Sequence, residues 1–331
     1  MVFATGPLTG TPISFNVRYQ VMAKSPATGG WGEASSAGYW GPELKFAGYD
    51  ALIIKGKSPN PVYLWINNEN VEIRDASKIW GRTTAETQKY IIQELGDEKI
   101  KVNCIGPAGE NLVRVACIVS NLHDVCGRGG LGAVMGSKGL KAIAVRGTRR
   151  VEIADRDKFK ELVKAIPEEF YRTLGGAGLA EFGTAVSVDP LNAGGRLPTM
   201  NFRKCQFEGA HKLDGHTMSE TILSDRRTCF GCMIRCKRVV DVKKPYSVDP
   251  IYGGPEYETI VALGSFCMND NLESIAKAHE LCNAYGLDTI STGVIVAFSM
   301  ECYEKGVITK DDADGLELKW GNYEAIIELI H

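Results

Sequence analysis

An α+β fold is expected for this chain of 331 residues. Before residue 150, short segments rich in β-branched and aromatic residues alternate with glycine-rich turns, which indicates strands. After residue 153, apolar residues recur at helical spacing, most clearly between residues 271 and 285. We therefore expect a β-sheet-rich N-terminal domain over residues 1–152 and a mainly helical domain over residues 153–331.

Residues 1–50 are rich in Gly, Pro, Ser and Thr, and are expected to form loops between short strands. Clearer strand signals follow as runs of Val, Ile, Leu and Tyr between turn residues. They cover residues 51–55, 62–66, 71–74, 101–105, 112–119 and 140–146. A helix is expected over residues 84–95, with Thr84 as its N-cap and Glu86 in its first turn.

The second half of the chain is expected to be helical around a loop-rich stretch at residues 176–215. Asp155 is the expected cap of the first helix. The predicted helices cover residues 155–165, 219–223, 271–285, 290–303 and 322–330. In the third of these, five residues share one face, which should be buried: Leu272, Ile275, Ala276, His279 and Cys282. The fourth is mostly apolar and is expected to be buried.

Charge and hydropathy exclude several classes of protein. Lys and Arg number 38 and Asp and Glu 40, so the net charge of −2 argues against a protein that binds nucleic acid mainly through phosphates. No apolar run reaches the ~18 residues that a membrane span needs. The first ten residues also lack the features of a signal peptide. We expect a cytoplasmic protein with no nucleic-acid partner and no membrane segment.

Three of the ten cysteines form a cluster, with Cys229, Cys232 and Cys236 at C-x2-C-x3-C spacing. The other seven are scattered and are expected to be small buried apolar residues. Three thiolates at this spacing can converge on one metal centre, from a loop that runs into a helix start. Basic neighbours would offset the negative charge: Arg226, Arg227, Arg235, Lys237 and Arg238. Because the usual fourth ligand is not evident, the motif has three interpretations: an iron–sulfur cluster, a zinc ion, or reduced structural thiols.

A second signal is the glycine-rich segment 127–138. Its backbone amides could approach a phosphate-bearing cofactor, with Arg128 and Lys138 supplying positive charge. The segment does not fit the P-loop pattern, because Ser precedes Lys, and no clear strand precedes it. A tight turn packed against a sheet is the alternative.

Three other segments carry weaker signals. Residues 31–41 combine small and aromatic residues, which suits either a flat ligand or a loop. Two glutamates in residues 253–259 follow a Gly-Pro bend, and a buried one could act as an acid or base. Between two helices, Gly286 occupies a C-cap position and Asp288 an N-cap position.

The histidines are less informative. His211 and His216 are expected to be solvated in a loop, with a metal-binding pair as the alternative, and His279 is expected to lie in the core. His123 precedes the glycine-rich segment and could face a ligand.

Taken together, these segments resemble the tungsten-containing aldehyde:ferredoxin oxidoreductase family. The resemblance runs nearly end to end and is carried by residues 6–10, 24–26, 43–50, 105–112, 127–138, 254–259 and 285–289, together with the three cysteines. It implies an N-terminal domain whose sheets cradle two pterin dithiolenes of the molybdopterin type. These hold one tungsten, or molybdenum in its place, with a [4Fe–4S] cluster nearby.

The resemblance also assigns site residues. Cys229, Cys232 and Cys236 would be three cluster ligands, and Glu258 matches the active-site glutamate. Residues that would contact the cofactor are Arg18, Ser35, Ala37, Gly127, Arg128, Gly129, Gly130, Asn283, Leu287 and Asp288. The chain departs from the family pattern at Ser35, where contacts through the backbone are expected to remain. It also departs at Asn283, whose carbonyl oxygen can still accept a hydrogen bond from a pterin amine.

The implied activity is oxidation of an aldehyde to a carboxylic acid, with electrons passed through the cluster to ferredoxin or another low-potential carrier. The implied partners are a small aldehyde or aryl-CoA substrate, and a second copy of the chain or iron–sulfur subunits. One alternative is the tungsten subunit of a benzoyl-CoA reductase, with His211 and His216 as proton donors.

The other alternative is a non-catalytic metal-binding fragment. Family chains are longer than this one, which opens beyond their usual start and stops inside the helical domain. The fourth cluster cysteine, a second pterin motif and the active-site histidine normally lie further on.

Overall fold

The computed structural model describes residues 1–331, with only the backbone at positions 174 and 175. It confirms an α+β fold with a sheet-rich first part and a helical second part. The division into domains at residue 152 stays a prediction, since by their contacts two later segments group with the first part. Unit 1 comprises Met1–Gly176, Thr228–Arg235 and Asn283–Asp288, and unit 2 comprises Ala177–Arg227, Cys236–Cys282 and Thr289–His331.

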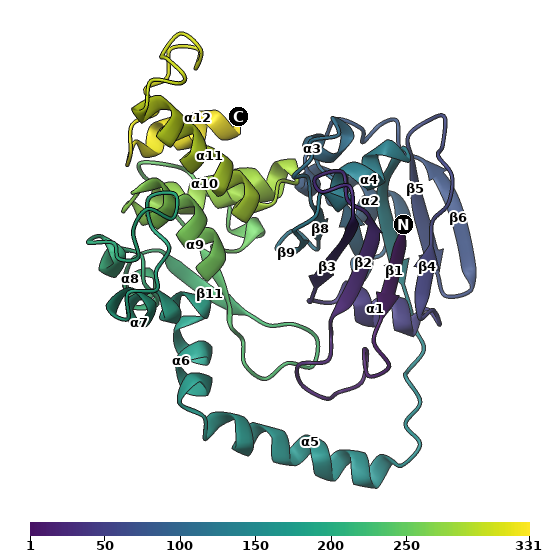
Figure 1. Cartoon of the computed structure of the whole chain (residues 1–331). Helices are drawn as coiled ribbons and strands as arrows, with labels where there is room; N and C mark the ends of the chain where they lie inside the picture. The colour runs from purple at the N-terminus through teal and green to yellow at the C-terminus, as the bar shows by residue number, and fades with distance from the viewer. The chain divides into compact units, whose positions relative to one another are not determined.

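Unit 1 is built on two β-sheets, drawn in purple to teal in Figure 1. The first is antiparallel with strand order β3-β2-β1-β4, and the second is mixed with order β6-β5-β10-β7-β8-β9. In the second sheet, β5 and β10 run parallel. The strands are β1 (Val2–Thr5), β2 (Tyr19–Lys24), β3 (Trp31–Ser36), β4 (Ala51–Ile53), β5 (Val62–Asn67), β6 (Asn70–Asp75), β7 (Lys101–Cys104), β8 (Ile118–Ser120), β9 (Asp124–Cys126) and β10 (Leu140–Arg146).

The main core of unit 1 joins side chains of both sheets. It includes Phe3 of the first sheet, Ile143 of the second, and Trp40 of α1 (Trp40–Phe46). A second cluster on the other face of the mixed sheet includes Ile91 of α2 (Thr84–Leu95). Strand β10 is therefore buried on both faces, which explains its nearly continuous apolar sequence.

Lys141 lies in β10, and its charged side chain is 0% exposed. Its ammonium group pairs with the carboxylate of Glu110 in α3 (Pro107–Glu110) and donates a hydrogen bond to the Arg82 carbonyl at 2.8 Å. The second carboxylate oxygen of Glu110 accepts the Gly81 N–H at 2.7 Å. The pair thus joins β10, α3 and the turn before α2.

Replacing Lys141 with methionine is expected to lower the free energy of unfolding by about 3–5 kcal/mol, because the Glu110 carboxylate would remain buried without a counter-charge. Chemical denaturation of the chain measures this loss. The double variant Lys141→Met/Glu110→Gln removes both charges and keeps an acceptor for Gly81. It should be more stable than the single variant, and equal stability of the two would contradict the argument.

Helix α2 has the predicted bounds, but its cap is Thr83 and not Thr84. The Thr83 hydroxyl accepts the Glu86 N–H, and the Glu86 carboxylate accepts the Thr83 N–H at 2.9 Å. Thr84 is buried instead, and its hydroxyl donates to the Asn283 carbonyl at 2.9 Å. These two reciprocal hydrogen bonds satisfy two backbone donors at the helix start, which makes Thr83 the N-cap residue.

The strand predicted over residues 112–119 is wrong for most of its length, since β8 covers only Ile118–Ser120. The backbone of the preceding residues pairs with the segment Asn283–Asp288 instead. Cys117 N–H donates to the Gly286 carbonyl at 2.8 Å, and Asp288 N–H donates to the Val115 carbonyl at 3.0 Å. These bonds help to explain why Asn283–Asp288 groups with unit 1.

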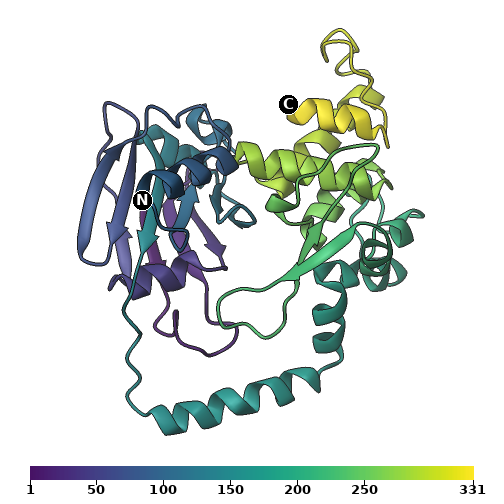
Figure 2. The same ribbon diagram turned by 180° about the vertical axis from the view of Figure 1, so that it is seen from behind.

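The later helices are seen from two sides in Figures 1 and 2. They are α5 (Arg156–Tyr171), α6 (Leu174–Phe182), α7 (Val188–Ala193), α8 (Gly215–Thr221), α9 (Tyr257–Leu263), α10 (Leu272–Tyr285), α11 (Thr289–Glu304) and α12 (Tyr323–Ile330). Asp155 caps α5 as predicted, although the helix is longer than expected. None of the helices described for residues 1–331 combines the length and apolar character needed to cross a membrane.

Several predictions for this half need correction. The stretch 176–215 contains α7 and most of α6, so it is not simply loop-rich, and the helix predicted over 219–223 begins earlier, as α8. An unpredicted hairpin joins β11 (Leu223–Arg227) to β12 (Lys237–Val240). Helix α11 was expected to be buried, but Ile295 is 50% and Phe298 60% exposed. Because apolar residues lie on both sides of α11, the sequence alone does not show which side is buried.

Helix α10 buries the predicted face, from Leu272 to Cys282. His279 lies in the core as expected, with Nε2 at 3.2 Å from the Tyr252 carbonyl oxygen. Burial lowers the pKa of His279 to about 4. A neutral imidazole is therefore part of the packing of unit 2.

Candidate functional site

The glycine-rich loop at residues 127–130 lies between β9 and α4 (Leu131–Ser137). The expectation that no strand precedes it is wrong, since β9 ends at Cys126 and pairs antiparallel with β8. A strand of three residues is too short to produce a recognisable alternation in the sequence. Gly130 is the N-cap residue of α4, with a left-handed φ of 70°.

Gly127 and Arg128 lie against Asp288, a residue 160 positions further along the chain. A Cβ atom at position 127 would lie only 2.8 Å from Asp288 Oδ1, so a larger residue there would force one of the two to shift. Arg128 Nη1 lies 3.5 Å from Asp288 Oδ2, whose residue is 4% exposed. Unit 1 thus brings together two of the segments that the resemblance assigns to the cofactor.

Two predicted contact residues, Ser35 and Ala37, lie at the end of β3 and directly after it. Ser35, Ala37 and Tyr39 are partly exposed, whereas the residues between them are buried. Arg18 Nη1 donates a hydrogen bond to Ser35 Oγ at 3.2 Å. This bond joins two of the residues that the resemblance assigns to the cofactor, whose contacts with it stay a prediction.

A buried polar network anchors the residue before the glycine-rich loop. The Cys126 thiol donates to the Tyr19 hydroxyl at 3.4 Å, and that hydroxyl donates to Asn103 Oδ1 at 3.0 Å. Burial raises the pKa of Cys126 to about 12 and that of Tyr19 well above its ordinary value. Both groups therefore stay neutral and hold β2, β7 and β9 together. The sequence does not reveal this network, because its members are far apart in the chain.

The cysteine-bearing segment Thr228–Arg235 also belongs to unit 1. Phe230 N–H donates to the Gly38 carbonyl at 3.2 Å, and its ring lies edge-on to those of Tyr39 and Phe46. Ser14 Oγ donates to the Gly231 carbonyl at 3.1 Å. The segment is thus fixed against the residues that follow β3.

Cys229 and Cys232 are joined by a turn in which Cys232 N–H donates to the Cys229 carbonyl at 3.1 Å. Burial raises the pKa of Tyr39, and the negative charge that Cys229 and Cys232 carry as thiolates raises it further. Cys236 groups with unit 2 and precedes β12, so the expected helix start after the motif is wrong.

The donors of the cysteine motif suit a cluster chemically, because thiolates are the ligands that iron–sulfur centres use. The structure places two of the three predicted ligands together in unit 1. In the part of the chain that the structure describes, no group of three His, Cys, Asp or Glu side chains is arranged to hold a metal ion. The three-cysteine ligand set stays a prediction.

The predicted active-site residue Glu258 lies in unit 2, in the first turn of α9. Its side chain is exposed, whereas the sequence prediction of an acid or base at this segment required a buried glutamate. The neighbouring Glu256 accepts a hydrogen bond from the Thr184 hydroxyl at 2.7 Å. The structure therefore does not group Glu258 with the residues of unit 1 described above.

The remaining histidines have local partners. His211 is exposed, with Nδ1 at 3.1 Å from the Glu208 carbonyl oxygen, and His216 is exposed beside the Phe182 ring. His123 Nε2 lies 3.9 Å from Asp124 Oδ2.

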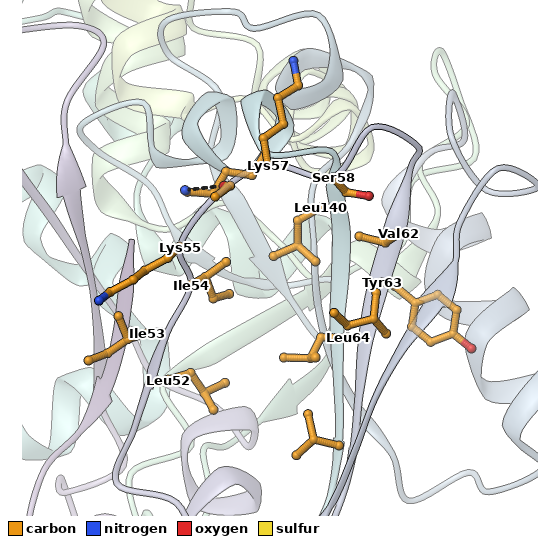
Figure 3. A pocket seen from close by; sticks show the side chains of 14 residues that line it. Leu52, Ile53, Ile54, Lys55, Lys57, Ser58, Val62, Tyr63, Leu64 and Leu140 are labelled. Carbon is orange, nitrogen blue, oxygen red and sulfur yellow. Dashed lines mark hydrogen bonds between the residues drawn. The ribbon is translucent and has the colours of Figure 1, made fainter.

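A separate groove of about 560 Å³ lies in unit 1 beside β4, β5 and β6 (Figure 3). Its wall is largely apolar, with Leu52, Ile54 and Leu64 among the lining residues, and Lys55 and Lys57 add positive charge. Lys138 of the glycine-rich segment also lines it, whereas the residues that the resemblance assigns to the site do not.

Comparison with known proteins gives consistent matches along the chain. The family model described as aldehyde ferredoxin oxidoreductase, N-terminal domain, matches residues 1–147. The model for domains 2 and 3 of the same enzyme matches residues 161–331. The gap between the two matches lies close to the predicted domain boundary.

Individual relatives agree with these models. The chain is 47% identical over 335 residues to the tungsten-containing aldehyde ferredoxin oxidoreductase of Pyrococcus abyssi, covering 100% of this chain and 54% of that protein. It is 33% identical over 346 residues to the aliphatic sulfonate oxidoreductase, WOR-like subunit, of Pyrococcus furiosus, again covering 100% of this chain and 54% of that protein. The chain therefore spans about half the length of these relatives.

A solved structure shares the fold. The active site complex BamBC of benzoyl coenzyme A reductase, in complex with 1,5-dienoyl-CoA, matches with a TM-score of 0.85 and 30% identity. The match covers 99% of this chain and 50% of that chain.

Proposed function

The chain belongs to the aldehyde ferredoxin oxidoreductase family, and we propose that it forms part of a cytoplasmic tungsten–pterin enzyme that oxidises aldehydes to carboxylic acids. The observation that carries the proposal is the grouping within unit 1 of the glycine-rich loop, Asn283–Asp288 and the cysteine segment. Ring reduction, as in a benzoyl-CoA reductase, is less favoured, because identity is 30% to that structure and 47% to an aldehyde-oxidising relative.

The charges and donors of unit 1 suit a phosphorylated pterin. Arg18 and Arg128 would bind its phosphates, and the buried carboxylate of Asp288 would accept hydrogen bonds from ring N–H groups. The backbone around Gly127 approaches closely because no Cβ intervenes. Ser35, Ala37, Gly129, Gly130, Asn283 and Leu287 would complete the contacts.

A bound tungsten, or molybdenum in its place, would supply the two-electron redox chemistry. In the overall reaction, an aldehyde and water give a carboxylic acid, two protons and two electrons. Cys229, Cys232 and Cys236 would hold a [4Fe–4S] cluster that passes the electrons singly to ferredoxin or a similar carrier. Glu258 would accept a proton from the hydrated aldehyde, a role that its match to the family pattern supports.

Metal analysis tests this proposal. We would express this chain and the full reading frame from its source, purify both without oxygen, and measure metals by mass spectrometry. Tungsten with about four irons per full-length chain is the expected result. Zinc alone, without tungsten, molybdenum or iron, would contradict the proposal and favour a non-catalytic metal-binding module. Assays with small aldehydes and with benzoyl-CoA then separate the two oxidoreductase activities.

A further inference from the structure

Ser25 connects the turn between β2 and β3 to the glycine-rich loop. It follows β2 directly and is 2% exposed. Its hydroxyl donates a hydrogen bond to the Gly129 carbonyl at 2.8 Å, 104 positions further along the chain. The same oxygen accepts the Ala27 and Thr28 N–H groups at 3.2 Å each, so its donor and both acceptor positions are used. These three bonds fix the orientation of the hydroxyl within unit 1.

The turn that carries Ser25 is closed by its own backbone bonds. Ser25 N–H donates to the Gly30 carbonyl, and Gly29 N–H donates to the Ser25 carbonyl, both at 2.9 Å. The glycine-rich loop packs closely against this turn, since a Cβ atom at Gly130 would lie only 2.9 Å from Pro26 Cγ. The loop is thus supported by a turn that is itself held in place, and Ser25 supplies the hydrogen bond between the two.

The peptide unit between Gly129 and Gly130 is the part of the loop that this bond orients. In a planar trans peptide, the carbonyl and the N–H point in opposite directions. Because the Gly129 carbonyl is directed at Ser25, the Gly130 N–H is directed away from the turn. Among the residues that the structure describes, none accepts a hydrogen bond from this N–H. The Gly130 N–H is therefore available to an oxygen atom of a bound ligand.

Glycine on both sides makes this peptide unit easy to reverse. Gly129 has a φ of 90° and Gly130 a φ of 70°, and neither carries a Cβ atom that would oppose rotation of the peptide between them. Without the Ser25 bond, the unit can turn over and present the Gly129 carbonyl where the Gly130 N–H now points. A carbonyl oxygen repels a phosphate, whereas a backbone N–H binds it.

We propose that Ser25 is a positioning residue for the pterin cofactor: its hydroxyl holds the Gly129 carbonyl and so keeps the Gly130 N–H directed at a phosphate oxygen of the bound pterin. This inference rests on the proposed function, in which the glycine-rich loop binds that cofactor. Ser25 itself lies outside the set of residues expected to contact it. Because Ser25 acts through the loop, its loss should weaken retention of the cofactor more than it weakens the fold.

The test is the rate at which the full-length protein releases pterin, followed by the fluorescence of the released and oxidised pterin. In Ser25→Ala, we expect release to be about 10- to 100-fold faster, the size of loss found when a residue that orients a metal-site ligand is removed. Ser265→Ala is the matched control, because Ser265 is 1% exposed and its hydroxyl donates to the Pro198 carbonyl at 2.7 Å within unit 2. Both variants should lose a similar free energy of unfolding, measured on cofactor-free protein, but only Ser25→Ala should release pterin faster.

The outcomes separate this inference from the proposed function. Wild-type protein without pterin would overturn both. Pterin that is present in all three proteins and released at one rate would overturn the role of Ser25 and leave the proposed function standing. Equally faster release from Ser265→Ala would assign the effect to a general loss of stability, which also overturns that role.

If Ser25→Ala does not fold, hydrogen exchange of the wild-type protein, measured with and without its cofactor, decides the question. Protection of the Gly130 amide by the bound cofactor supports the inference, because this N–H has no acceptor within the described residues. Unchanged exchange of that amide overturns it.

Discussion

Replacing Cys229 with alanine is expected to remove the iron–sulfur cluster from the full-length protein and to lower aldehyde oxidation by at least about 100-fold. Loss of an outer partner of a metal ligand already costs 10- to 100-fold in affinity or activity, and Cys229 would itself be a ligand. The thiolate is the soft donor that iron–sulfur clusters require, and an alanine side chain has no donor atom.

The location of Cys229 makes its replacement informative about chemistry and not only about folding. The Cys229 side chain is buried. The segment is nevertheless fixed by hydrogen bonds of its neighbours Thr228, Phe230 and Gly231. The Thr228 hydroxyl donates to the Cys232 carbonyl at 2.6 Å, a bond that does not involve the Cys229 side chain. We therefore expect the segment to keep its path in the variant.

Cys205→Ala is the matched control, because Cys205 is an exposed cysteine outside the motif. Iron content by mass spectrometry and the visible absorption of the cluster provide the measurement. Full iron occupancy in Cys229→Ala would show that this cysteine is not a ligand. Iron loss in Cys205→Ala as well would show that the cysteine motif does not determine iron binding.

Replacing Glu258 with glutamine in the full-length enzyme is expected to lower kcat about 10²- to 10⁴-fold, the usual contribution of a positioned acid or base. Glutamine keeps the shape of the side chain and removes its ability to accept a proton. KM should change much less than kcat, because the proposed role is proton transfer and not substrate binding. Steady-state kinetics with a small aldehyde measure both constants.

Glu256→Gln is the control for this variant, since it removes a carboxylate two positions away. The Glu256 side chain accepts a hydrogen bond from the Thr184 hydroxyl, which a glutamine can also accept. Its kcat should stay near that of the wild type. A normal kcat for Glu258→Gln would refute the role of Glu258, and equal losses in both variants would indicate a general charge effect.

Local periodicity predicted the regular elements well. Helices α2 and α10 and strand β10 have bounds within one residue of those expected, because each is a long segment with one clear pattern. Predictions failed where the partner of a segment was distant. Residues 115–117 resemble a strand, yet Val115 and Cys117 bond to residues 286–288.

Family resemblance is identified from residue types and spacing, and the family models confirm it along most of the chain. The spacing of Cys229 and Cys232 and the run of glycines at residues 127–130 are local features, so they are readable without coordinates. The contacts that surround these features cannot be read from the sequence. The sequence places Tyr39 191 positions before Phe230, and only folding brings their rings into contact.

The sequence alone thus determined the family, the α+β class, the main helices and the residue types that suit a pterin and a cluster. The tertiary structure decided which of these residues share one unit: Arg128 beside Asp288, and the cysteine segment beside Tyr39. The physical reason is that helices and strands arise from patterns within about 5–15 residues. A site is instead held by hydrogen bonds and ring contacts between residues more than 100 positions apart, which leave no periodic trace in the sequence.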